Sequence, residues 1–223
     1  DGSILRASRE LSSLAIPAVG VNLGRLGFLA SVSPNELEQA FRDVVAGNCR
    51  IVEHLMLECT VFRDGQPVAS AIGLNEAALL RGAPFSILDI DLQVDGELAT
   101  TYSCDGLIIS TPVGSTAHSL SAGGPILRKT LDAFVISAIS PHTLTVRPVV
   151  DSSNRIYEMT LRETVAETAV AVDGKVIASV TEQDVIRVQK APRPFLMIEV
   201  DGQNDYRSLR EKLDWGGRIR HKK

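Results

Sequence analysis

Residues Ser110 to Pro125 read STPVGSTAHSLSAGGP, a run of small hydroxyl residues and glycines that is the most informative part of the chain. The apolar residues 107–109 precede it and predict a buried strand that ends near Ser110. A polar turn should then open a short helix near Ser115, where free backbone N–H groups and hydroxyls face a ligand. Small side chains would let a flat or phosphorylated ligand approach the backbone. The alternative is a Ser/Gly-rich loop that binds nothing.

Four other motifs accompany this stretch. Asp1-Gly2-Ser3 precedes apolar residues at helical spacing. Residues 18–29 read as a short apolar strand that runs into a loop with three glycines. Asn75-Glu76 places an amide and a carboxylate side by side among apolar residues, and Asp173-Gly174 follows another apolar run.

Together these motifs resemble the NAD kinase family, and the resemblance covers essentially all of the chain. The family carries Gly-Gly-Asp-Gly-Thr, Gly-x-Asn-x-Gly-x-Leu-Gly-Phe-Leu, Asn-Glu, and Asp-Gly followed by Thr-Pro-x-Gly-Ser-Thr-Ala-Tyr-x-x-Ser-x-Gly-Gly-Pro. They appear here as Asp1-Gly2-Ser3, Gly20 to Leu29, Asn75-Glu76, and Asp105-Gly106 through Pro125. Ser3 replaces the usual Thr, His118 replaces the usual Tyr, and the sequence begins at the aspartate of the first motif.

Pattern and resemblance predict the same α+β fold in two domains. Residues 1–48 read as the remnant of a truncated, Rossmann-like α/β domain, with a capping box at residues 33–36 and a helix stop at Gly47. Alternating runs separated by Asp-Gly turns predict antiparallel hairpins, and hence an all-β body from about residue 49 to 200. The resemblance implies that residues 49–202 form a β-sandwich domain that binds NAD. The 203–223 tail, with an amphipathic helix expected over 206–215, would pack back on the first domain.

The resemblance implies an enzyme that phosphorylates the adenosine ribose 2′-OH of NAD with ATP, or another phosphoryl donor, to give NADP. Asp1 would be the catalytic base and would also contact the substrate. Gly2 would admit phosphate, and Arg6 could reach it. The remaining binding residues implied by position are Asn75, Glu76, Asp105, Thr116, Ala117, His118, Ser121 and Asp173.

Simpler roles exist for several of these residues. Asp1 could only cap a helix, Arg6 could lie on a solvated helix face, and an Asn-Glu pair is ordinarily a strand end. Asp173 is explained equally well as a hairpin turn or as a ligand contact. The imidazole of His118 could act as a catalytic acid, although the tyrosine of the family cannot easily play that part.

The composition limits the classes of partner that we expect for this protein. The formal net charge is −4 and the only basic run is residues 218–223, which argues against nucleic acid. No apolar run is long enough to span a bilayer. Three unpatterned cysteines suit a reducing cytoplasm, and the histidines and cysteines show no metal-ligand spacing.

The resemblance further implies a divalent ion, in particular magnesium, that bridges the donor phosphates. It also implies a homo-oligomer, a dimer or a tetramer, in which a neighbouring copy completes the site, with the Ser137–His142 loop as the candidate segment. Two other classes stay open: a dinucleotide sensor without turnover, and a lipid or sugar kinase that shares only the first motif. The long motif from Thr111 to Pro125 argues against the second.

Overall fold

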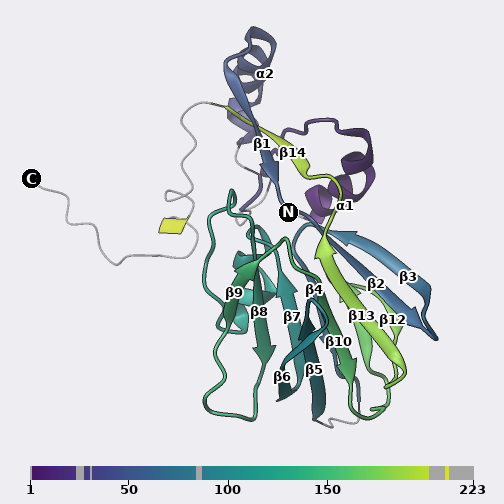
Figure 1. The fold of residues 1–223 in the computed structure, drawn as a ribbon. Coiled ribbons are helices and arrows are strands. Elements are labelled where there is room, and N and C mark those ends of the chain that lie inside the picture. The colour runs from purple at the N-terminus through teal and green to yellow at the C-terminus, as the bar shows by residue number, and fades with distance from the viewer. Residues whose placement is uncertain (1, 24–27, 31, 84–86, 201–208, 211–223) are drawn as a thin grey trace, which may run out of the picture.

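The structure, a computed structural model, describes residues 2–23, 28–30, 32–83, 87–200 and 209–210 of the 223 (Figure 1). The helices are α1 (Gly2–Leu11), α2 (Leu37–Ala46) and α3 (His118–Ser121), with short 3₁₀ turns η1 (Ser12–Leu14), η2 (Pro34–Glu36) and η3 (Gly114–Thr116). The strands are β1 (Cys49–His54), β2 (Leu57–Arg63), β3 (Gln66–Gly73), β4 (Glu76–Leu80), β5 (Leu88–Val94), β6 (Glu97–Cys104), β7 (Gly106–Ser110), β8 (Ala133–Ile139), β9 (Val149–Ser152), β10 (Tyr157–Leu161), β11 (Ala169–Val172), β12 (Lys175–Ser179), β13 (Asp184–Lys190) and β14 (Phe195–Val200).

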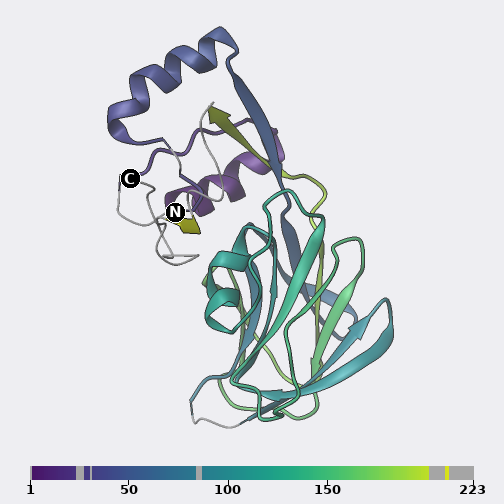
Figure 2. The same cartoon turned by 90° about the vertical axis from the view of Figure 1, so that its left-hand side faces the viewer.

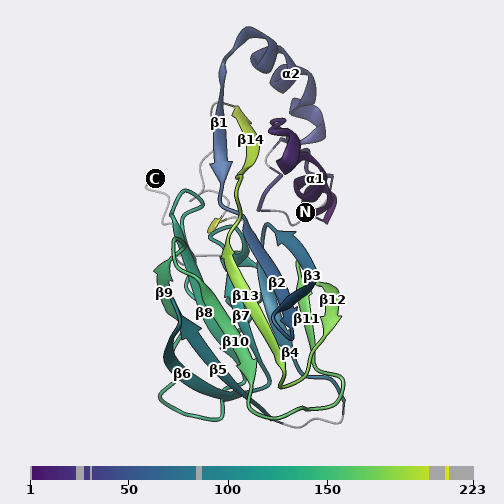
Figure 3. The ribbon, with the colours of Figure 1, turned by 45° about the vertical axis from the view of Figure 1, so that its right-hand side comes forward.

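Two antiparallel six-stranded sheets form a sandwich, in the orders β3-β2-β13-β10-β5-β6 and β12-β11-β4-β7-β8-β9 (Figures 1 and 3). Strands of the first sheet alternate, so that Leu88, Ile90 and Leu92 of β5 face the core while the residues between them are half-buried. All five residues of β7 are buried, because η3 and α3 lie on the outer face of the second sheet (Figure 2). The predicted two-domain α+β fold is confirmed.

The Asp-Gly turns form three hairpins, as predicted. Asp64, Asp95 and Asp173 have φ values of 51°, 53° and 48°, and the glycine after each also has a positive φ. Such turns match the twist of antiparallel strands, and Asp tolerates this backbone region better than most residues. These turns join β2 to β3, β5 to β6, and β11 to β12.

Strands β1 and β14 belong to neither sandwich sheet. They pair with each other along their length and rise from the sandwich toward the N-terminal helices (Figures 1 and 3). Ala18 forms a parallel bridge to Met197 of β14, so the region predicted as an apolar strand contributes isolated bridges. The sandwich sheets therefore span residues 57–190, while the boundaries at 49 and 202 stay a prediction. The tail helix predicted over residues 206–215 lies almost wholly outside the described residues.

The N-terminal part packs on the sandwich through a second apolar cluster. Leu74 and Val113 are buried in it together with Met197, and Ile4 and Leu5 of α1 pack against them. Helix α1 thus rests on the two segments that carry the Asn-Glu and Ser/Gly motifs.

Helix α2 begins as its sequence predicts. The Ser33 N–H donates to the Glu36 carboxylate at 3.0 Å, and Gly47 ends the helix with a φ of 78°. No helix within the described residues is long and apolar enough to cross a membrane.

Candidate functional site

The segment from Leu74 to Glu76 crosses from one sheet to the other, and Asp173 holds it in place. One carboxylate oxygen, Oδ2, accepts the Leu74 N–H at 3.0 Å. The other, Oδ1, accepts the N–H groups of Asn75 and Glu76 at 2.7 and 3.2 Å. The Asp173 N–H donates in turn to the Glu76 carbonyl at 3.0 Å. All three amides of the crossing segment therefore have their partner in one side chain.

The carbonyls of the same segment are held by the start of the Ser/Gly motif. The Thr111 N–H donates to the Asn75 carbonyl at 2.8 Å, and the Thr111 hydroxyl donates to the Leu74 carbonyl at 2.5 Å. Gly114 lies against the same backbone, since a Cβ there would be 2.1 Å from the Asn75 carbonyl oxygen. The two motifs thus form one rigid unit, and only a glycine fits at position 114.

Glu76 is the side chain that this unit leaves unsatisfied. It is only 7% exposed, and its Oε2 has no hydrogen-bond partner among the described residues. Burial, and then the nearby charge of Asp173, raise its pKa to about 7. Burial also raises the pKa of Asp173, although its three amide donors and the charge of Arg9 oppose that shift. A buried carboxylate without a partner is costly, so this position suits a ligand that supplies donors.

The Ser/Gly stretch has the predicted local structure, because β7 ends at Ser110 and helical turns follow from Gly114. Three of its hydroxyls, however, bond to protein atoms. Ser115 donates to the Pro112 carbonyl at 2.6 Å, Thr116 donates to the Val113 carbonyl at 3.2 Å, and Ser119 bonds Ser137 across to β8 at 3.2 Å. A buried stretch must satisfy its own backbone, and these hydroxyls do so.

The residues that follow Thr116 are more open to solvent. His118 and Ser121, at the two ends of α3, are exposed, and Ala117 is half-buried. Helix α3 packs against β7 and β8.

Asp105 lies at the other end of β7. In the antiparallel pair, Glu76 is opposite Ser110, whereas Asp105 precedes Gly106, which is opposite Leu80. Five residue steps of about 3.3 Å separate Asp105 from Ser110 by about 17 Å. The Asp105 carboxylate pairs with Arg81 at 2.9 Å and lies 3.9 Å from His142 Nε2. Asp105 and Glu76 therefore lie at opposite ends of β7.

The predicted N-terminal residues lie on or before α1. Gly2 is its exposed first residue, and Asp1 lies outside the described residues. The Arg6 side chain is 80% exposed and pairs with Glu10 at 3.1 Å, one turn along the helix. This pairing is that of a solvated helix face.

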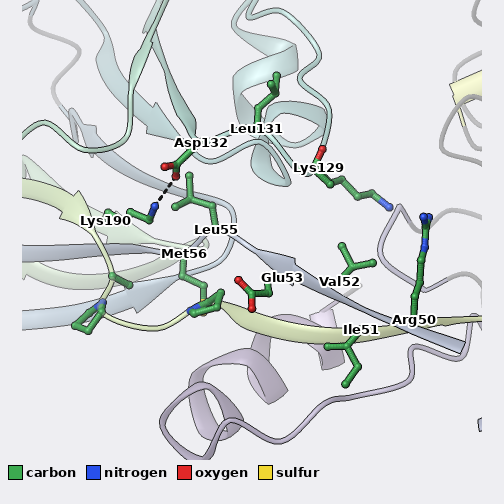
Figure 4. A pocket seen from close by; sticks show the side chains of 14 residues that line it. Arg50, Ile51, Val52, Glu53, Leu55, Met56, Lys129, Leu131, Asp132 and Lys190 are labelled. Carbon is green, nitrogen blue, oxygen red and sulfur yellow. Dashed lines mark hydrogen bonds and ion pairs between the residues drawn. The ribbon is translucent and has the colours of Figure 1, made fainter. Parts of the chain in front are cut away.

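A cavity of about 560 Å³ opens between β1 and the loop over residues 129–132 (Figure 4). Arg50, Lys129 and Lys190 line it with apolar residues, and Lys190 pairs with Asp132 at 2.6 Å. None of the described residues predicted from the motifs is in its lining. The cavity lies where the β1–β14 pair joins the sandwich.

Sequence reasoning missed three contributors. Thr111 and Gly114 fix the Asn75 backbone, and Arg81 neutralises Asp105. Thr111 and Gly114 lie inside the Ser110–Pro125 motif, and that position is the sequence signal that could have identified them. Nothing local to Arg81 marked it. Within the described residues, no group of three or more His, Cys, Asp or Glu is placed to hold a metal ion.

Both parts of the chain are similar to known proteins. Residues 1–49 match the model of the ATP-NAD kinase N-terminal domain, and residues 74–200 match that of the ATP-NAD kinase C-terminal domain. The chain is 54% identical to the NAD kinase of Rhodopirellula baltica over 98% of this chain and 70% of that protein. It is 41% identical to the NAD kinase of Cellvibrio japonicus, over 98% of this chain and 73% of that protein.

Two solved structures share the fold. Yeast NADH kinase in complex with NADH has a TM-score of 0.90 at 26% identity, over 100% of this chain and 66% of that one. An NAD kinase from Archaeoglobus fulgidus in complex with ATP has a TM-score of 0.78 at 27% identity, over 97% of this chain and 78% of that one. By sequence and by structure, the chain belongs to the NAD kinase family, the enzymes that convert NAD to NADP.

Proposed function

We propose that this protein transfers the terminal phosphoryl group of ATP to the 2′-OH of the adenosine ribose of NAD, and that the Glu76 end of β7 binds the dinucleotide. The observation that carries the proposal is the buried carboxylate of Glu76, whose Oε2 has no hydrogen-bond partner among the described residues, on a backbone held by Asp173 and Thr111. Ribose hydroxyls are donors that such a carboxylate accepts. The complexes of the two structural relatives with NADH and with ATP support both ligand classes.

In this reaction Asp1 acts as the base. It accepts the proton of the 2′-OH as that oxygen forms its bond to the γ-phosphorus, while the bond from the γ-phosphorus to the β-phosphate oxygen breaks and ADP leaves. Gly2 and the start of α1 face the phosphates. Thr116, Ala117, His118 and Ser121 line the base pockets. A divalent cation, with magnesium the expected one, would supply neutralisation of phosphate charge and would be held mainly by the donor phosphates.

A coupled assay on the full-length protein tests the function. NAD or NADH is offered with ATP or polyphosphate, and 2′-phosphorylated product is measured. We expect product with ATP, and loss of that activity in Glu76→Ala. Binding of NAD without product under every condition would instead identify a sensor.

We further propose that Asp105 acts in the site of a neighbouring copy. Its distance from Glu76 along β7, and its place beside the loop that follows β8, leave it at a separate surface of its own chain. A homo-oligomer would bring this surface to the dinucleotide of the next copy. The three cysteines are free, which accords with a cytoplasmic location.

Mixing two inactive variants tests this arrangement. Asp1→Asn and Asp105→Ala, after subunit exchange, should regain roughly a quarter of the wild-type activity, since half of the dimers would contain one intact site. No recovery, with subunit exchange demonstrated, would place Asp105 outside the neighbour's site.

A further inference from the structure

We propose that Asp173 is a positioning residue for dinucleotide binding: its carboxylate fixes the Leu74–Glu76 segment so that the side chains of Asn75 and Glu76 are presented to the ligand. This inference rests on the proposed function. It differs from both simpler roles of this residue, the plain hairpin turn and the direct ligand contact.

The hydrogen bonds of Asp173 exceed what its turn requires. Asp95 occupies the same kind of turn with nearly the same φ. Its carboxylate accepts the Ile156 N–H at 2.9 Å and pairs with Arg155, both of which are exposed contacts. The Asp173 carboxylate instead reaches a buried segment almost a hundred residues away and accepts three consecutive amides. The turn shape therefore does not explain the side chain.

Those three amides also occupy both oxygens of Asp173, which limits a direct role in ligand binding. Each bond is 2.7–3.2 Å long, within the normal range. Only a carboxylate offers two acceptor atoms in this geometry, because an asparagine would turn its NH₂ group toward one amide donor. The residue type is thus matched to the backbone segment.

The other side of the segment is held independently. Thr111 binds the carbonyls of Leu74 and Asn75, so the two residues enclose the segment from its donor side and its acceptor side. Because the backbone groups of the segment are hydrogen-bonded within the protein, only its side chains are available to a ligand. The Glu76 carboxylate is the group this arrangement leaves for a ligand.

The charge of Asp173 has a second consequence. The charged groups that act on this pair are Arg9 of α1, which acts on Asp173, and Asp173 itself, which acts on Glu76. If the ligand favours ionised Glu76, NAD affinity should rise as the pH passes the pKa of Glu76. Neutralising Asp173 should lower that pKa, so the rise in NAD affinity should occur at lower pH.

The test compares Asp173→Asn with Asp95→Asn in the full-length protein. Without nucleotide, hydrogen exchange of the amides of Leu74, Asn75 and Glu76 should speed up about tenfold or more in Asp173→Asn, as expected for one lost buried hydrogen bond. The KM for NAD should rise about tenfold while kcat changes little. Asp95→Asn also loses a backbone partner, and it should change neither quantity.

Thr111→Val supplies a second test if Asp173→Asn does not fold. It loosens the same segment from the carbonyl side with Asp173 intact, so the KM for NAD should rise again. An unchanged KM would overturn the proposal. Weaker binding in Asp173→Asn without faster amide exchange, or without the pH shift, would also overturn it and make Asp173 a ligand contact. Glu76→Ala distinguishes failure of this inference from failure of the proposed function, because full NAD affinity in that variant would refute the proposed dinucleotide site itself.

Discussion

The two ends of strand β7 present carboxylates in opposite situations. At the Ser110 end, Glu76 is buried and one of its oxygens has no partner among the described residues. At the Gly106 end, Asp105 is partly exposed and is paired with Arg81 and close to His142. A paired carboxylate is satisfied within its own chain, whereas an unpaired buried one is costly until a ligand arrives. This difference is the reason we propose the Glu76 end as the dinucleotide site.

The largest expected effect tests whether the reaction occurs at that end, where α1 packs on Leu74 and Val113. Asp1→Asn keeps the shape of the side chain and removes the base. We expect kcat to fall by at least about 10²-fold, within the usual range for a lost general base. NAD affinity, measured by calorimetry, should change little. More than a tenth of the wild-type kcat would show that Asp1 is not the base.

Gly114→Ala tests how tightly the Glu76 end is built. The new Cβ would lie 2.1 Å from the Asn75 carbonyl oxygen, so the backbone must move. We expect the free energy of unfolding to fall by about 2–3 kcal/mol, the cost of a forced shift in a packed core. Denaturant unfolding measures it. A loss under about 0.5 kcal/mol, the size of an ordinary surface substitution, would mean that the motifs are not one rigid unit.

Stability against pH separates the two ends directly. Because folding raises the pKa of Glu76 from 4.5 to about 7, the folded state holds its proton more tightly, and stability falls as pH rises through this window. Glu76→Gln should therefore add about 1–3 kcal/mol at pH 8 and little at pH 4. Asp105→Asn should cost about 1 kcal/mol or less at pH 8, since it removes a partly exposed ion pair. Equal effects of the two substitutions would remove the contrast.

His118 should give the smallest effect. If its ring only stacks on the ligand, His118→Tyr keeps near wild-type NAD affinity, while His118→Ala loses about 0.5–1.5 kcal/mol of binding. Calorimetric titration with NAD measures both. An inactive His118→Tyr protein would show that the site depends on imidazole itself.

Local patterns predicted local structure well. The Asp-Gly turns, the capping box at Ser33 and the end of β7 at Ser110 each depend on a few neighbouring residues. The sheet that a strand joins is a long-range property, and no local pattern indicates that β1 pairs with β14, far along the chain.

The same distinction between local and long-range information applies to the candidate site. Asn75, Glu76 and the Ser/Gly motif could be selected from the sequence, but their grouping depends on the pairing of β4 with β7. Asp105 seemed near because it precedes the motif, yet an extended strand carries neighbours in sequence far apart. The contacts of Asp173 span almost a hundred residues, and no local signal reports them.

Proton release on NAD binding tests whether Glu76 contacts the dinucleotide. Calorimetry at pH 7 in two buffers of different ionisation enthalpy counts the protons released. With a pKa of about 7, Glu76 is about half protonated in the free protein, and ribose hydroxyls that donate to both of its oxygens favour the ionised form. We expect release of about half a proton in the wild type and none in Glu76→Gln. Equal release in both proteins, or none in the wild type, would contradict the assignment of NAD to this end of β7.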